Sequence, residues 1–499
     1  MSENIAGLLK ILGITVILLV LWAFLSFKVP ETFLSTNNIE NLLRRTALYG
    51  ILGIGVAFVI ISSGIDLSIG SLVCLCACLL ALFLEVEYAP MQMAKVWETN
   101  ASEKTMLVSG VDLQENDEVW YFHDRRDKGM LKVGSVESAE NGRTKITIAE
   151  GTFRDHASSG SSVGTLSPTY AVSALNSDTQ LTIDSSMPAV AARDMLKMVK
   201  LGGSTRERAV QESSKADGGT LISLADPVSG IDTSYRVVPV GRSAMMSIPL
   251  AVASVLGIAL LLGLVHGLLI TKWKQQPFIV TLCGLLIYRG ISRWLTNDQT
   301  VGFIEYQESL GALATGRWVL WQSPEGTESF GIPYSFFVLV LLTVLAVIFL
   351  NFTVWGRYIL ALGRNEEAAR YSGINTGPIT ILAYVICSGL AGIGGILFAL
   401  DSNSIAPSSF GNFFELYAIA AAVLGGCSLR GGEGSILGVV VGTALMQTLY
   451  NSIVLLKIPD ELEYTIIGAV ILLGVVSDEL VRRVAGSWRS KADKSASGQ

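Results

Sequence analysis

Charged side chains are scarce in this chain of 499 residues. Asp, Glu, Lys and Arg together make up 16% of it, whereas soluble domains carry about 25%. The formal net charge is −6, so the chain lacks the basic surplus that nucleic-acid binding requires. Hydrophobic residues make up 51%. This composition is typical of a membrane protein that also carries a soluble part.

Motifs for metal, disulfide and nucleotide chemistry are missing as well. The chain has 6 cysteines, all within apolar segments, and 3 histidines without the spacing of metal ligands. We interpret the cysteines as small hydrophobic packing residues. No G-x-x-x-x-G-K-[ST] sequence occurs, so the chain shows no nucleotide-binding loop. We therefore expect no metal or cofactor bound directly by the chain and no ATPase activity of its own.

Long apolar runs, in contrast, are abundant. A membrane-spanning helix needs about 20 mostly apolar residues. The first run is too long for the hydrophobic part of a signal peptide, and no small-x-small cleavage site follows it. The sequence predicts an all-α polytopic membrane protein with about ten transmembrane helices. The predicted spans lie near 8–27, 42–62, 68–85, 246–271, 277–295, 334–354, 378–400, 413–427, 434–456 and 462–480.

A segment of different composition separates the third and fourth predicted spans. Residues 87–245 hold about half of the acidic residues and no long apolar run. Stretches such as "DEVWYF" and "TKITIAE" alternate or are rich in β-branched residues, as strands are. We expect a β-rich soluble insert, looser in its Ser/Gly-rich part around 157–220. The membrane domain then comprises 1–86 and 246–485, followed by a tail at 486–499.

Short basic loops predict the orientation, because Lys and Arg gather in cytoplasmic loops of membrane proteins. Four basic stretches fall on one side of a ten-span arrangement, together with both termini. They are 271–277, 356–370, 428–434 and 482–491. We therefore expect both termini in the cytoplasm, the insert outside the cell's inner membrane, and Arg44 and Arg45 as exceptions on the outer side.

The stretch "SSGIDLSIGS" at 62–71 places a carboxylate between two apolar runs. A carboxylate within a span is costly and is kept where it faces water, a partner or a substrate. Glycines and serines favour broken helices that line cavities. In one interpretation these residues line or hinge a polar pathway; in the other, Asp66 or Ser68 caps the third span in a short turn. The candidate pathway residues here are Ser63, Gly64, Asp66, Ser68 and Gly70.

The stretch "GRNEEAARYSGIN" predicts a short charged helix between two spans. Asn365 or Arg364 begins it, acidic residues occupy its first turn, and Gly373 ends it. Glu366 and Arg370 are four residues apart and share one face. Such a helix is either a solvated surface helix or a docking helix for a partner protein.

These stretches resemble, in order, the permeases of the ribose/monosaccharide ABC importer family. "SSGIDLSIGSLV" is similar to the family's TGGIDLSVGS pattern, with Ser63 in place of the usual glycine. His266 holds a place usually held by Asn. The further similar segments are 263–292 around "PFIVTL", 354–375 and the glycine-rich 422–453. The resemblance covers nearly all of 1–86 and 246–485, and it leaves the insert out.

The resemblance implies a transmembrane permease subunit that moves a ribose-like monosaccharide across the inner membrane. ATP would be used by a separate ATPase subunit. The other implied partners are an extracytoplasmic sugar-binding protein, a second permease copy or related permease, and membrane lipid. The loop at 356–376 would carry the coupling helix that docks into the ATPase. Its residues are Gly363, Arg364, Asn365, Glu366, Glu367, Ala368, Ala369, Arg370 and Gly373.

Two more residues join the candidate pathway. We interpret His266, within "LVHGLLI", as a neutral hydrogen-bonding residue between helices. Arg289, near the end of the fifth span, either snorkels to the membrane interface or pairs with a carboxylate in the pathway.

Other functions stay open at this point. The same machinery could serve nucleosides, autoinducer-2 or branched-chain amino acids. A different class is a membrane-anchored receptor or enzyme that acts through the insert, where "HDRRDK" at 123–128 reads as a polar hairpin turn. Ten spans with a coupling-type loop exceed what an anchor needs, so contact with a binding protein or partner subunit is the favoured role for the insert.

Overall fold

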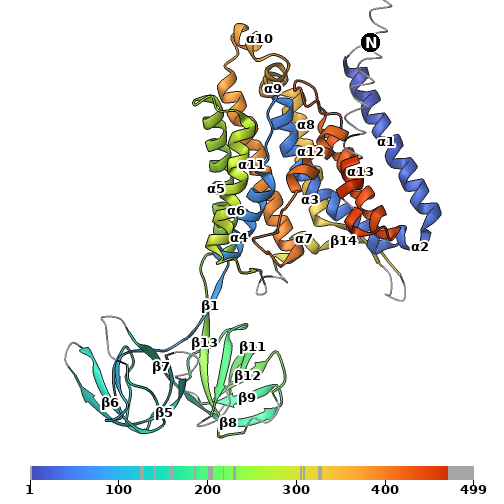
Figure 1. Ribbon diagram of the computed structural model, residues 1–499. Coiled ribbons are helices and arrows are strands. Elements are labelled where there is room, and N and C mark those ends of the chain that lie inside the picture. The colour runs from blue at the N-terminus through green and yellow to red at the C-terminus, as the bar shows by residue number, and fades with distance from the viewer. Residues whose placement is uncertain are drawn as a thin grey trace, which may run out of the picture. The chain divides into compact units, whose positions relative to one another are not determined.

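The computed structural model contains two compact units (Figure 1). One comprises Met1–Glu85 and Met246–Gln499, and the other Val86–Met245. Most of the tenth predicted span, the tail and most of the "HDRRDK" stretch lie outside the described residues. The structure describes residues 3–469 and 472, apart from 124–127, 140–141, 157–161, 185–186, 201–205, 217–218, 229–231, 304–305, 307–308, 324–328 and 463.

The first unit is built mainly from helices. They are α1 (Glu3–Lys28), α2 (Pro30–Phe33), α3 (Thr36–Ile61), α4 (Ile69–Phe83), α5 (Ile248–Thr271), α6 (Pro277–Leu295), α7 (Gly311–Thr315), α8 (Tyr334–Phe352), α9 (Val354–Arg364), α10 (Glu366–Tyr371), α11 (Thr376–Ser402), α12 (Phe414–Leu424) and α13 (Ile436–Leu455). A 3-10 turn at Asp460–Leu462 follows, and an antiparallel hairpin of β14 (Arg317–Gln322) and β15 (Ser329–Pro333) precedes α8.

Among the described residues, seven helices are long and apolar enough to cross a membrane. They are α1, α3, α5, α6, α8, α11 and α13. The predicted helical membrane fold is confirmed at this level. α4 and α12, where the third and eighth spans were expected, are apolar but shorter than the seven. The count of ten spans therefore stays a prediction.

α3 and α11 lie at the centre of this unit, side by side in Figure 1. In the apolar stretch of α3, 83% of the residues are buried, compared with 6% in that of α1. α11 packs against α3, α4 and α5, and α3 also packs against α8, α12 and α13. A Cβ on Gly55 of α3 would lie 3.2 Å from the Cys387 carbonyl oxygen of α11, so these helices meet with little between their backbones. The loop that follows α3 thus begins inside the helix packing.

The second unit is built from strands. They are β1 (Val86–Pro90), β2 (Ala94–Asn100), β3 (Thr105–Ser109), β4 (Glu118–Phe122), β5 (Lys128–Ser138), β6 (Thr144–Glu150), β7 (Gly164–Pro168), β8 (Tyr170–Ser177), β9 (Gln180–Ile183), β10 (Met195–Val199), β11 (Arg206–Ala216), β12 (Gly219–Leu224) and β13 (Arg236–Ala244). The predicted β-rich region is confirmed.

These strands form two barrels with the same strand order. The first is a closed barrel in the order β2-β3-β6-β5-β4-β7. The second runs β8-β9-β12-β11-β10-β13, and β13 also pairs with β8. Each strand of the second barrel takes the position of the strand six places earlier in the first. The insert therefore repeats one six-stranded topology.

Each barrel has its own buried core. Tyr121, Leu131 and Ile146 belong to the first core, and Ile183 and Leu196 to the second. The expectation of a looser part around 157–220 is wrong, since β8 to β12 lie there and enclose the second core. Ser residues within β8 and β11 interrupt the apolar alternation by which a strand is predicted from sequence.

β1 lies outside the repeat and pairs with β13. Their antiparallel register runs from Val86 opposite Ala244 to Pro90 opposite Val240. The insert therefore begins and ends at directly paired residues. The whole insert can therefore occupy the one connection between α4 and α5.

Candidate functional site

The loop between α3 and α4 holds the most deeply buried charge of the candidate set. Asp66 and Ser68 are both fully buried. Asp66 Oδ1 accepts hydrogen bonds from the Ser68 backbone N–H, at 2.9 Å, and from Ser68 Oγ, at 2.7 Å. Ser68 is the N-cap residue of α4, and its own side chain makes no capping bond. Asp66 thus fixes the residue from which α4 starts.

The second carboxylate oxygen of Asp66 is different. Within the part of the chain that the structure describes, Asp66 Oδ2 is buried and accepts no hydrogen bond from a nitrogen or oxygen donor, while the Cys387 thiol of α11 lies beside the carboxylate. A buried acceptor without a partner loses the free energy of its hydration. The carboxylate therefore combines a capping oxygen with one that can accept a further donor.

Three helices bring aromatic and imidazole side chains to this loop. Tyr288 Oη of α6 lies 2.8 Å from His266 Nε2 of α5. Tyr384 Oη of α11 donates to the Ile65 carbonyl oxygen at 3.3 Å, and its ring contacts His266 edge to face with centroids 6.4 Å apart. We name Asp66, Ser68, His266, Tyr288 and Tyr384 the Asp66 cluster. The contact between His266 and Tyr288 joins α5 to α6.

Close packing of α6 holds the cluster together. A Cβ on Gly284 would lie 2.8 Å from His266 Nε2 and 3.1 Å from the Ser68 Cβ. A glycine is therefore required where α6 passes both side chains. Among the described residues, His266 Nδ1 and Ser388 Oγ are further buried atoms without a hydrogen-bond partner. These atoms are buried and have unused hydrogen-bonding capacity.

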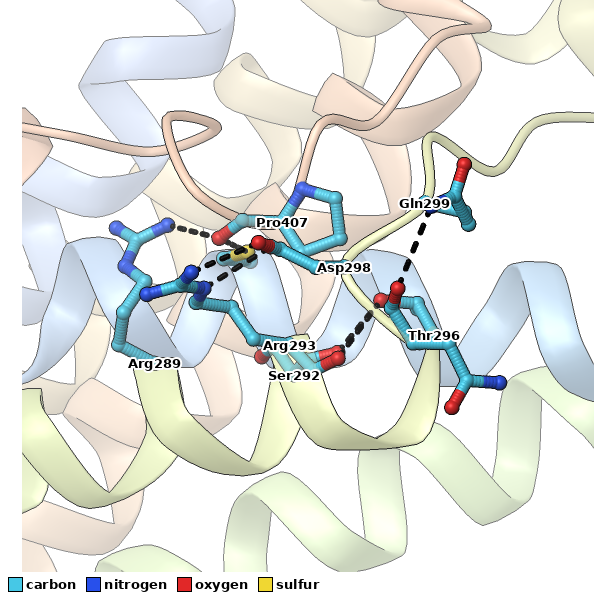
Figure 2. A network of polar contacts seen from close by, with 9 residues as sticks. Arg289, Ser292, Arg293, Thr296, Asp298, Gln299 and Pro407 are labelled. Atoms are coloured by element: carbon cyan, nitrogen blue, oxygen red, sulfur yellow. Dashed lines mark hydrogen bonds and ion pairs between the residues drawn. The ribbon is translucent and has the colours of Figure 1, made fainter.

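Arg289 bonds two backbone carbonyl groups (Figure 2). Its Nη1 donates to the carbonyl oxygens of Pro407, at 3.0 Å, and Phe410, at 2.6 Å. Both acceptors belong to the connection between α11 and α12. The next charged residue of α6, Arg293, is exposed and donates two hydrogen bonds to Asp298, of 2.9 and 2.7 Å. That bonding holds the pKa of Asp298 below its ordinary value.

Gly70 lies where the start of α4 meets the start of α12. A Cβ there would lie 2.2 Å from Glu415 Oε2 and 2.3 Å from the Gly411 carbonyl oxygen. Glu415 is buried at 8% exposure. Sequence reasoning missed this second carboxylate, although it stands in an apolar segment as Asp66 does. Tyr288 and Tyr384 gave no sequence signal, because tyrosine is common in ordinary cores.

The short helix α10 forms where it was predicted. Asn365 is its N-cap, and the Asn365 side chain accepts from the Ala368 backbone N–H at 2.9 Å. Gly373 has φ +81° after the helix end. Thr376 Oγ1 donates to Glu366 Oε1 at 3.1 Å.

α10 is largely exposed. Ala369 is its one buried residue, while Tyr371 is 91% exposed. Exposed side chains also stand at Arg364, Glu367, Ala368 and Arg370. A short helix that presents an exposed aromatic residue beside charged ones can dock on another protein.

No group of three or more His, Cys, Asp or Glu side chains within the described residues is placed to hold a metal ion. The seven apolar helices make the chain a multi-pass membrane protein. Residues 226–475, half of the chain, match the family described as "Branched-chain amino acid transport system / permease component". The chain belongs to this family of permease components.

Individual relatives carry sugar names. The chain is 34% identical over 262 residues to the ribose import permease protein RbsC of Escherichia coli K12, covering 52% of this chain and 75% of that protein. It is 32% identical over 289 residues to the xylose transport system permease protein XylH of the same strain, covering 47% and 72%. The ribose import permease of Haemophilus influenzae is 33% identical over 273 residues, covering 53% and 80%. No solved structure matches the chain.

Proposed function

We propose that this chain is the permease subunit of an ABC importer that moves a ribose-like monosaccharide across the inner membrane. The observation that carries the proposal is its 34% identity to a ribose import permease over 75% of that protein. Similarity to a xylose permease points to the same chemical class of cargo. The chain itself would perform no bond chemistry, and ATP would be hydrolysed by a partner subunit.

The candidate pathway passes the Asp66 cluster. A sugar is neutral and rich in hydroxyl groups, so it needs donors and acceptors more than charge or apolar surface. Asp66 Oδ2 and His266 Nδ1 are buried polar atoms with unused hydrogen-bonding capacity among the described residues. They would bond briefly with cargo when the surrounding helices separate. The remaining pathway candidates, Ser63, Gly64, Gly70 and Arg289, would shape this region without contacting the sugar.

The partners follow from the same proposal. The ATPase would dock on α10, whose exposed side chains include Glu367, Arg370 and Tyr371. A sugar-binding protein would deliver cargo from outside, and a second permease copy or related permease would complete the pathway. Ten spans, cytoplasmic termini, an extracytoplasmic insert at 87–245 and a coupling loop at 356–376 are part of this proposal.

Branched-chain amino acids are the second candidate cargo, because the description of the matching family names them. The individual relatives favour the sugar. The decisive experiment compares uptake of radiolabelled ribose, xylose and leucine by cells with and without the protein. Ribose or xylose uptake that depends on the protein supports the proposal, and uptake of leucine alone overturns its cargo.

Copurification tests the partner. The tagged protein is isolated in mild detergent, alongside the variant Glu366→Ala/Glu367→Ala/Arg370→Ala. We expect an ABC ATPase to copurify with the unaltered chain and to be lost from the variant. Folding of the variant is checked by its thermal unfolding, because these side chains are exposed. Equal ATPase recovery with both proteins would exclude α10 as the docking element.

A further inference from the structure

Three segments that are far apart in sequence meet at the end of α3. They are 61–63, 363–364 and 430–432, which we name the junction. The Gly432 backbone N–H donates to the Ile61 carbonyl oxygen at 2.8 Å. Ser63 Oγ lies 2.9 Å from the Gly363 carbonyl oxygen and 3.0 Å from that of Arg430. Hydrogen bonds therefore join all three segments directly.

The junction has no room for additional side chains. A Cβ on Gly363 would lie 1.8 Å from the Ile61 carbonyl oxygen and 2.4 Å from the Gly432 nitrogen. A Cβ on Gly431 would lie 1.9 Å from Ser63 Oγ. Contacts this short cannot be relieved by a side-chain rotation where the opposing atom is backbone. The backbones of the three segments therefore lie close together, and a side chain at Gly363 or Gly431 would push them apart.

The junction connects the end of α9, next to α10, with the loop that follows α3. Gly363 is the second-last residue of α9, and Asn365 is both the C-cap of α9 and the N-cap of α10. On the other side, Ser63 stands three residues before Asp66. A displacement of α10 thus reaches the loop of the Asp66 cluster across one hydrogen bond and a few residues of backbone.

Ser63 is an unexpected residue for its conformation. Its φ is +65°, in the left-handed region that glycine adopts without strain. The serine keeps this conformation while its hydroxyl reaches two carbonyl oxygens. A hydroxyl has one proton, so it can donate fully to only one of the two at a time. Glycine, the usual residue at this place in the family that the sequence resembles, would fit the backbone better but could make neither bond, so these two bonds are particular to this chain.

We propose that Ser63 is a positioning residue that fastens the loop of the Asp66 cluster to the segment carrying α10, so that movement of α10 is passed to the start of α4. This inference rests on the proposed function, in which α10 docks on the ATPase. Ser63 contacts neither cargo nor nucleotide in this scheme. Its bonds to Gly363 and Arg430 make movement of the start of α4 depend on movement of α10.

The test uses Ser63→Gly in the full chain with its copurified ATPase, reconstituted in liposomes. Glycine accepts the same φ, so the variant is expected to unfold at the same temperature or higher. Ser62→Ala is the matched control, because Ser62 Oγ donates only within α3, to the Val59 carbonyl oxygen at 2.8 Å. Two quantities are measured: ribose transported per ATP hydrolysed, and amide hydrogen exchange at 64–70 and 366–371 with and without AMP-PNP.

We expect Ser63→Gly to retain the ATPase and its hydrolysis rate while the transport ratio falls about fivefold, a factor typical of one lost hydrogen bond. AMP-PNP should change exchange at 366–371 in both variants, but at 64–70 only in Ser62→Ala and the unaltered chain. The inference would be overturned if Ser63→Gly transported as much ribose per ATP as the unaltered chain and AMP-PNP changed its exchange at 64–70 to the same extent. A chain that recovers no ATPase at all would instead overturn the proposed function, which keeps the two failures distinct.

Discussion

Substitutions of Asp66 separate its capping role from a role in transport. Asp66→Ala removes both bonds to Ser68 and leaves the Ser68 N–H and hydroxyl without partners in a fully buried place. Loss of such a cap, with its buried donors unpaired, costs about 2–4 kcal/mol of stability. Asp66→Asn keeps an acceptor oxygen for Ser68, so we expect a loss of about 1 kcal/mol or less.

Transport should respond differently. Asp66→Asn removes the charge and replaces one carboxylate oxygen with an NH₂ group, so the acceptor at Oδ2 is lost. Hydrogen bonds to charged groups contribute about 1.5–3 kcal/mol, which corresponds to a decrease in uptake of about tenfold or more. We therefore predict that Asp66→Asn is stable and nearly inactive, whereas Asp66→Ala is both unstable and inactive.

The assay pairs thermal unfolding of the purified protein with uptake of radiolabelled ribose by cells that contain equal amounts of it. Ser68→Ala serves as the control for capping, because it removes the hydroxyl donor at 2.7 Å and retains the backbone donor. Normal uptake by Asp66→Asn would refute the pathway role and leave Asp66 as a helix cap. Equal destabilisation by Asn and Ala would refute the capping argument.

Three further predictions follow from the packing, the insert and the loop after α6. Gly284→Ala should abolish uptake and lower the unfolding temperature, since its Cβ would lie 2.8 Å from His266 Nε2; Gly290→Ala, with open space around its Cβ, is the control. Replacing 86–244 by a short Gly/Ser linker should leave a membrane-inserted, monodisperse protein, because Val86 and Ala244 are paired; aggregation would contradict this. Arg293 lowers the pKa of Asp298, so their pairing stabilises above the ordinary pKa of 3.8 and is lost only as pH falls through the lowered value. Unfolding temperatures of Asp298→Asn and the unaltered protein should therefore differ by the same amount throughout mildly acidic and neutral pH.

Local signals in the sequence were sufficient for the helices and their ends. The apolar runs predicted the long helices because length and hydropathy are properties of one segment. α10 was predicted together with its boundaries, since Asn365 caps it through a residue three positions away and Gly373 adopts a positive φ after it. In each case the interacting groups lie within one or two helical turns.

The Asp66 cluster could be predicted only in part, because its contacts cross long sequence distances. Asp66 itself was found as a lone charge in an apolar segment. Tyr384, however, bonds the carbonyl oxygen of Ile65, 319 residues away. Arg289 bonds Pro407 and Phe410, 118 and 121 residues away. The sequence of the fifth predicted span does not indicate whether Arg289 bonds these carbonyl groups, reaches the membrane interface or pairs with a carboxylate.

The insert shows a different limit, because its repeat was found in the strand topology and was not predicted from the sequence. β2 to β7 and β8 to β13 follow the same order, yet the first barrel core uses Tyr121 and Phe153 and the second uses Met187 and Tyr235. A barrel core fixes which positions face inward and leaves the residue types free within a total volume. Two copies can therefore diverge in sequence while each remains closed. β1 pairs with β13, a strand of the second barrel. The first and last strands of the insert therefore both belong to the sheet of that barrel.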